Sequence, residues 1–137
     1  MKAENITFAS ADDIRSGKKD EQHIVYSQDG KCLYGTVHQG ILSYCIRPGT
    51  EIICDNAFLF SYSIQSIVIP EGVIAIGKQA FAGCNSLSAI DLPSSIEYIG
   101  EEPFKFCDNL AEIRIPKGTK GKFEKLLPEY KDKLIEK

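Results

Sequence analysis

The 137-residue sequence contains no run of apolar residues approaching the roughly 18 that a membrane-spanning helix requires. It also lacks a C-x-x-C pair, a glycine-rich phosphate-binding loop and any histidine beyond His23 and His38. These absences count against the common zinc, thioredoxin-like and nucleotide-binding sites. A net charge of −3 counts against a nucleic-acid binder driven by phosphate contacts. We therefore expect no cofactor, no metal and no nucleic-acid partner.

The length is that of one ordinary domain, and 43% hydrophobic with 26% charged residues is near the globular average. Residues 1–22 are charged throughout and lack the apolar core of a signal peptide. The protein is thus expected either to stay inside the cell or to be a mature or trimmed form. The cysteines are odd in number, and we expect reduced, mostly buried thiols at Cys32, Cys45, Cys54, Cys84 and Cys107.

A repeat of 23 residues is the strongest feature of the sequence, and it relates Phe58, Phe81 and Phe104. Periods of this length are typical of solenoids, in which each unit buries its apolar side chains only by stacking on a copy of itself. Further positions recur at the same spacing: Ile53, Ile76 and Ile99; Ile64, Leu87 and Leu110; Ile67, Ile90 and Ile113; Ile69, Leu92 and Ile115; and Pro70, Pro93 and Pro116.

Each unit is expected to contain two short extended segments. The alternation of Ile90 and Leu92 indicates a strand with one buried face. Proline then ends the strand, because it has no N–H to donate to a ladder. In the second segment, Ile96 and Ile99 are expected to point inward.

The remainder of each unit must turn the chain back. We expect Gly77 and Gly100 to do so through a positive φ, which glycine tolerates. The A-F-x-x-C segment is predicted to form one helical or 3₁₀ turn that carries Phe81 and Cys84 into the core. Stacking at about 4.8 Å per coil would then align the phenylalanines in an aromatic column.

The best-preserved copy, residues 69–84, reads I-P-E-G-V-I-A-I-G-K-Q-A-F-A-G-C. It resembles the BspA-like leucine-rich repeat family, whose consensus joins I-x-L-P to I-G-x-x-A-F-x-x-C, and the resemblance covers roughly residues 29–128. What it implies is an α/β fold, a right-handed solenoid with a parallel β-sheet on the concave face. Such proteins are often adhesion or protein-binding modules at bacterial cell surfaces, and they carry no catalytic motif. The resemblance therefore implies a cell-surface or secreted protein; a cytoplasmic one is the alternative.

We divide the chain into four segments. Residues 1–22 form a flexible or short helical lead, with a helix around 11–19, and residues 23–45 an N-terminal cap hairpin that turns at Asp29-Gly30. Residues 46–116 form three repeats. Residues 117–137 form C-terminal capping helices, the second of which begins at Pro128. Their apolar residues recur at helical spacing: Phe123, Leu126, Leu127, Tyr130 and Leu134. Their net positive charge is interpreted as a solvated outer face.

Two surfaces are candidate binding sites. In the I-x-L-P strands the residues between inward positions face outward, which predicts a concave binding face of Ser66, Val68, Ala89, Asp91, Glu112 and Arg114. Asp91 and Arg114 should form a cross-strand pair. A second, apolar column comprises Ile52, Ile74, Ala75 and Tyr98. The concave face lacks the tryptophan, tyrosine and arginine clusters that usually anchor an interface.

Three functions remain open. The favoured one is a non-catalytic module for protein–protein or cell-surface interaction, with a protein or cell-surface ligand as partner. The alternative is a structural self-association element, a weak homo-oligomer formed through the apolar column or the N-terminal end. A thiol enzyme that pairs Cys45 with His38 is a remote third. Cys84 and Cys107 should be adjacent, as free thiols in preference to a disulfide.

Overall fold

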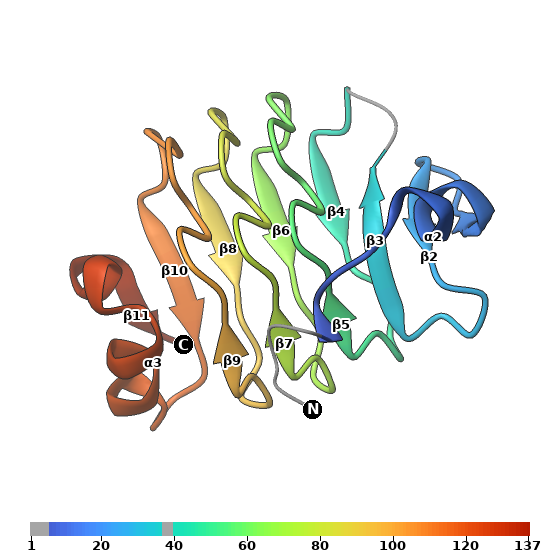
Figure 1. Ribbon diagram of the computed structural model, residues 1–137. Helices are drawn as coiled ribbons and strands as arrows, with labels where there is room; N and C mark the ends of the chain where they lie inside the picture. Colours follow the sequence, from blue (N-terminus) through green and yellow to red (C-terminus); the bar gives the residue numbers. More distant parts are fainter. Residues whose placement is uncertain (1–5, 37–39) are drawn as a thin grey trace.

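The computed structural model describes residues 6–36 and 40–137 of the chain (Figure 1). It is a solenoid in which successive coils lie side by side, from the N-terminal elements at one end to α3 at the other. His38 and its pairing with Cys45 lie outside the described residues. The elements are α2 (Ala11–Ser16), β1 (Lys18–Lys19), β2 (Ile24–Tyr26), β3 (Cys32–Thr36), β4 (Ser43–Cys45), β5 (Ile52–Ile53), β6 (Ser66–Val68), β7 (Ala75–Ile76), β8 (Ala89–Asp91), β9 (Tyr98–Ile99), β10 (Glu112–Ile115), α3 (Lys120–Leu126), a 3₁₀-helix η1 (Pro128–Lys133) and β11 (Leu134–Glu136).

Each coil contributes one strand to each of two sheets. The five-stranded sheet has the order β11-β10-β8-β6-β4, and all its neighbours are parallel. The six-stranded sheet has the order β1-β2-β3-β5-β7-β9 and is parallel from β3 onward. The register follows the repeat, since Ile67 pairs with Ile90 and Ile90 with Ile113 in the five-stranded sheet. The mixed α/β solenoid with parallel sheets expected from the sequence is confirmed.

The aromatic column is present in the core. The ring centroids of Phe58 and Phe81 are 5.4 Å apart and those of Phe81 and Phe104 5.8 Å, with nearly parallel planes. Tyr44 and Tyr130 extend the column at its two ends, at 6.1 and 5.4 Å from Phe58 and Phe104. Each such pair adds about 0.5–1.5 kcal/mol beyond the burial of its area.

The A-F-x-x-C segment, predicted to form a helical or 3₁₀ turn, contains i→i−3 hydrogen bonds such as Cys84 N to Phe81 O but forms no helix. The segment is a run of turns whose N–H groups alternately bond within the coil and to the next coil. Phe58 N donates to Ala80 O, and Phe60 N to Ala82 O, at 2.7 and 2.8 Å. A helix would direct all these N–H groups along its own axis. The segment nevertheless buries Phe81 and Cys84, as expected.

Gly77 and Gly100 also act differently from the prediction, because neither has a positive φ. They are needed because the coils approach closely. A Cβ on Gly77 would lie 2.4 Å from Asp55 N, and one on Gly100 would lie 2.6 Å from Lys78 N. In the turn segment that follows Gly77, positive φ values occur at other residues, Gln79 and Gly83.

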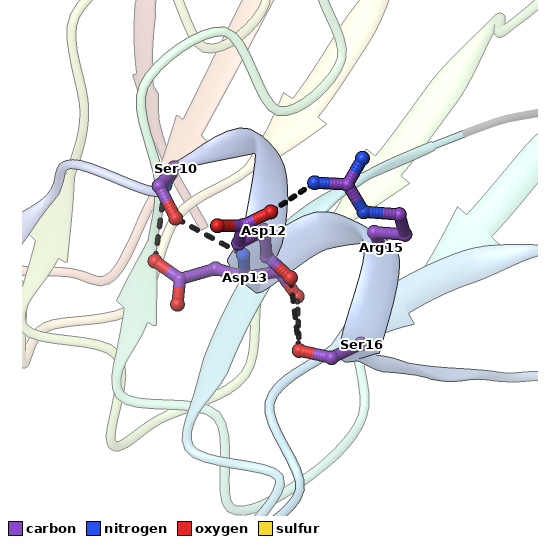
Figure 2. Close-up of polar contacts among 5 residues, drawn as sticks. All are labelled: Ser10, Asp12, Asp13, Arg15 and Ser16. Atoms are coloured by element: carbon purple, nitrogen blue, oxygen red, sulfur yellow. Dashed lines mark hydrogen bonds and ion pairs between the residues drawn. The ribbon is translucent and has the colours of Figure 1, made fainter.

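The N-terminal segment begins with a shorter helix than expected. A capping box starts α2: Ser10 Oγ accepts from Asp13 N, and Asp13 Oδ2 accepts from Ser10 N, both at 3.0 Å (Figure 2). Asp12 and Arg15 form an ion pair on the exposed side of the same turn. Lys18 and Lys19, expected to be helical, pair with β2 as the strand β1 because the extended Gly17 ends the helix.

The expected hairpin is formed by β2 and β3, which pair antiparallel around residues 27–30. Gly30 adopts the positive φ (77°) that this turn requires. Asp29 Oδ1 accepts hydrogen bonds from Ser27 Oγ and from Lys31 N, which holds the turn closed. The hairpin extends only the six-stranded sheet, so β4 remains an edge strand of the other sheet.

At the C-terminal end, α3 is followed by η1, which has Pro128 in its first turn as predicted. Leu134, expected to be helical, instead lies in β11, which pairs parallel with β10. Leu134 forms a strand and not a helix because, paired with Ile113, it continues the row of buried apolar side chains that the repeats form. The division of the chain at residues 22, 45 and 116 stays a prediction. No helix among the described residues is long and apolar enough to cross a bilayer.

Candidate interaction surfaces

The six residues predicted for the concave binding face lie together on the five-stranded sheet; we call them the sheet face. The register aligns Ser66 with Ala89 and Glu112 in one column and Val68 with Asp91 and Arg114 in the other: Ser66, Val68, Ala89, Asp91, Glu112 and Arg114. Val68 is 41% exposed. Ala89 is only 8% exposed, contrary to expectation, because its methyl group is shorter than the side chains of Ser66 and Glu112 that flank it.

The predicted pairing of Asp91 with Arg114 is present within a three-residue network. Arg114 Nε lies 2.8 Å from Glu112 Oε1, and its terminal nitrogen lies 3.5 Å from Asp91 Oδ1. The hydrogen bond from Arg114 to Glu112 raises the pKa of Arg114 further above its ordinary value, so the guanidinium stays charged. Beside the network is a shallow hollow of about 360 Å³ that also involves Pro116 and Lys137. This part of the face suits a polar partner surface.

The second predicted surface is less continuous than the sequence suggested. Ile52, Ala75 and Tyr98 are in register on β5, β7 and β9, as expected. Ala75 is only 2% exposed, so it does not join the patch; the larger Ile52 and Tyr98 flank it on both sides. Ile74 is the most exposed member, at 38%. The remaining apolar surface is therefore centred on Ile74.

A groove of about 480 Å³ lies beside the edge strand β4, between Cys45 and residues 19–22. Tyr44 and Asp20 line the groove and belong to a chain of hydrogen bonds in which the buried Tyr26 donates to Tyr44 at 2.5 Å and Tyr44 donates to Asp20. Burial raises the pKa of both phenols, so they are protonated near neutral pH. Arg47 stacks on Tyr26, with its guanidinium carbon 5.5 Å from the ring centroid. The network ties the N-terminal turn to the first coil.

The cysteines are free thiols that form no disulfide bond. The exposure of Cys45 differs from the expected burial. Cys84 Sγ donates to Phe58 O at 3.2 Å, and Cys107 Sγ to Phe81 O at 2.9 Å, so the two thiols occupy equivalent places in adjacent coils. If Cys107 ionises, it can accept a hydrogen bond from Cys84, which raises the pKa of Cys84 and lowers that of Cys107.

A second thiol pair, missed in the sequence, joins the hairpin to the first coil. Cys54 donates a hydrogen bond to Cys32 and thereby lowers the pKa of Cys32 to about 7. Cys54 itself is buried, and its pKa is raised. The pair lies one residue off the 23-residue spacing, so no periodicity indicated it. No group of three or more potential metal ligands occurs within residues 6–36 and 40–137.

A third surface, also missed, is formed by three exposed aromatic side chains, Phe60, Tyr62 and Phe106, which we call the aromatic platform. They are 46, 54 and 61% exposed. The rings of Phe60 and Tyr62 stack with centroids 6.0 Å apart, and Lys105 Nζ lies 5.3 Å from the Phe106 centroid. A sequence signal existed: Phe60 and Phe106 stand where the intermediate repeat has Gly83.

Comparison with known proteins agrees with this architecture. Residues 41–126, more than half of the chain, match the family described as the BspA type leucine rich repeat region. A leucine-rich repeat protein from Eubacterium ventriosum is similar in structure, with a TM-score of 0.56, 16% identity, and coverage of 71% of this chain and 32% of that one. The pneumococcal vaccine antigen PcpA has a TM-score of 0.51, 21% identity, and coverage of 67% and 29%. No curated protein matches the sequence significantly. The chain spans about a third of each solved structure, and these identities establish the fold alone.

Proposed function

Because this chain belongs to the BspA-type leucine-rich repeat family, we propose that it is a non-catalytic module whose sheet face binds another protein. The observation that carries the proposal is the arrangement of that face. Three parallel strands present two columns of side chains in strict register, and Val68, Asp91 and Arg114 in one of these columns are about two-fifths exposed. Solenoids commonly use such regular, extended surfaces for binding.

The chemistry of the sheet face supports a protein as the partner. Val68 offers an apolar contact at one side, and the network of Asp91, Glu112 and Arg114 offers hydrogen-bonding charges of both signs at the other. Apolar area next to hydrogen-bonding charged groups is usual in a protein interface. We further propose a cell-surface or secreted location and an adhesion-like role; the similarity to a protein described as a vaccine antigen supports this.

The test is capture of partners with matched variants. The double variant Val68→Arg/Arg114→Glu places a positive charge at the apolar end of the sheet face and reverses the charge at the other end. The control Glu97→Lys reverses the charge of an exposed residue outside the sheet face. Each protein is immobilised and exposed to surface extracts of bacterial and host cells, followed by quantitative mass spectrometry. We expect partners that the wild type and the Glu97 variant retain and the double variant loses at least about tenfold. If the double variant captures the same proteins at the same level, the sheet face is not the binding site.

A second candidate function, self-association, is favoured by the exposed Ile74 on the six-stranded sheet. A dimer formed there should weaken when Ile74 is replaced by serine. Sedimentation velocity over a hundredfold range of concentration should then reveal a dimer for the wild type and less of it for Ile74→Ser. A wild-type protein that stays monomeric throughout that range excludes this function.

A further inference from the structure

The aromatic platform combines an unfavourable backbone with exposed side chains. Phe60, Gly83 and Phe106 occupy the same place in successive coils and all have a positive φ, of 60°, 73° and 64°. Glycine adopts this conformation freely, whereas a phenylalanine does not. The Phe60 ring packs on the backbone at Gly83 and on Tyr62, yet both phenylalanine rings remain about half exposed. The turn therefore presents two aromatic surfaces that a partner can contact.

The platform also has a defined shape. A Cβ on Gly83 would lie 2.3 Å from Phe60 Cδ1, so the Phe60 ring rests on the backbone of the next coil in the space that a side chain would fill. Phe60 and Phe106 are separated by two coils, which is about 9.6 Å at the spacing of parallel strands. A polyproline II helix repeats every three residues, or about 9.3 Å. Side chains at positions i and i+3 of such a segment, laid along the solenoid axis, would match the spacing of the two coils that carry these rings.

The exposed area argues against a second copy of this chain as the occupant. Three half-exposed aromatic side chains offer on the order of 300 Å², whereas a stable dimer buries about 800 Å² on each partner. A short peptide needs less area, particularly when its conformation is already ordered. Polyproline II segments meet that condition and are known to dock on aromatic surfaces.

We propose that the aromatic platform binds a proline-rich segment of a partner protein in the polyproline II conformation, with prolines three residues apart contacting Phe60 and Phe106. This inference rests on the proposed protein-binding function and adds a second, separate contact surface to it. Tyr62 stacks against Phe60 and enlarges the aromatic surface of the platform.

The test is a titration of the whole chain, labelled with ¹⁵N, with a synthetic peptide of four Pro-Ala-Pro triplets up to millimolar concentration. We expect saturable shifts of the amide signals of Phe60, Gly83 and Phe106. The variants Phe60→Gly and Phe106→Gly should each weaken binding at least about tenfold. Both should fold, because Gly83 occupies the same place, and an unchanged amide spectrum elsewhere verifies it.

Two controls separate the alternatives. A peptide of four Gly-Ala-Gly triplets should not bind, and Val68→Arg/Arg114→Glu should bind the Pro-Ala-Pro peptide as the wild type does, which separates this site from the sheet face. The inference is overturned if the peptide gives no saturable shift, if the glycine variants bind it equally well, or if dilution or lipid vesicles alone shift the same signals, which would assign the platform to a second copy or to a membrane surface. Failure of the peptide together with sheet-face-dependent capture would remove only this inference.

Discussion

Ser61, Cys84 and Cys107 occupy one place in three successive coils, and a single atom distinguishes the first from the others. Each thiol donates to the carbonyl of a phenylalanine in the preceding coil. Ser61 Oγ is buried and has no hydrogen-bond partner among residues 6–36 and 40–137. A buried hydroxyl without a partner keeps its desolvation cost, whereas a thiol at the same place loses less on leaving water. Of the three residues at this place, Ser61 therefore contributes least to the stability of the fold.

We expect Ser61→Cys to raise the free energy of unfolding by about 1 kcal/mol, because it removes the unpaired hydroxyl and fills the place with the residue that the other coils use. Urea denaturation under reducing conditions measures the change. The exposed Ser88 provides a control, since Ser88→Cys should leave stability within about 0.5 kcal/mol. A loss of stability in the Ser61 variant would show that the hydroxyl is satisfied.

The paired phenols of Tyr26 and Tyr44 make stability depend on alkaline pH. Burial raises both pKa values above the ordinary value of 10.0, so the folded state disfavours the phenolates more than the unfolded chain does. Their contribution to stability is then fully present below pH 10 and declines as the pH rises above it. We expect the urea midpoint to fall as the pH rises from about 10 to about 11, with a smaller fall for Tyr44→Phe. Equal slopes for the two proteins would contradict this assignment.

At the scale of the element, each coil is stabilised more by its contacts with the next coil than by hydrogen bonds within itself. Its strands are only two to four residues long, too short to be stable alone. Gly77 and Gly100 allow the backbones of adjacent coils to touch where the second strand ends. The repeat indicated that these positions are special, but periodicity does not distinguish a glycine needed for its φ from one needed for its missing side chain.

Gly77→Ala should therefore lower the free energy of unfolding by about 1–3 kcal/mol or more, because its Cβ would overlap the backbone nitrogen of Asp55. Gly121 is the matched control. It lies within α3, and a methyl group added there would have no atom within 4 Å apart from its chain neighbours and the backbone of its own helix, so Gly121→Ala should stabilise the protein by about 0.5–1 kcal/mol. Thermal and urea unfolding measure both. Tolerance of alanine at Gly77 would mean that the coils can move apart.

At the scale of the whole molecule, the aromatic column joins elements that are far apart in the sequence. It runs from Tyr44 on the first coil through three phenylalanines to Tyr130 in the C-terminal cap. In a solenoid, stability is roughly the sum of the coils and their interfaces. With so few coils, the loss of one interface is expected to affect the entire chain.

Phe81→Ala tests this coupling, because Phe81 is fully buried between two other rings. We expect a loss of about 3–5 kcal/mol in the free energy of unfolding, a large part of what a domain of this size usually has. Phe8→Ala, at a residue that is 67% exposed, should change it by less than about 0.5 kcal/mol. Circular dichroism and tryptic cleavage should report one common transition; separate transitions at the two ends would show that the coils unfold independently.

The sequence alone determined what happens along the solenoid axis: the period, the ladders of like residues and the sheet columns that hold the sheet face. This is possible because stacked copies bring equivalent positions together whatever the path of one coil. Only the tertiary structure decided what happens across a coil. Ala75 and Ala89 are buried because their neighbours have longer side chains, and Leu134 lies in a strand. Phe60 and Phe106 are exposed to solvent and have the positive φ that glycine adopts most easily. These outcomes depend on how closely the coils approach and on what covers each side, and a one-dimensional period contains neither quantity.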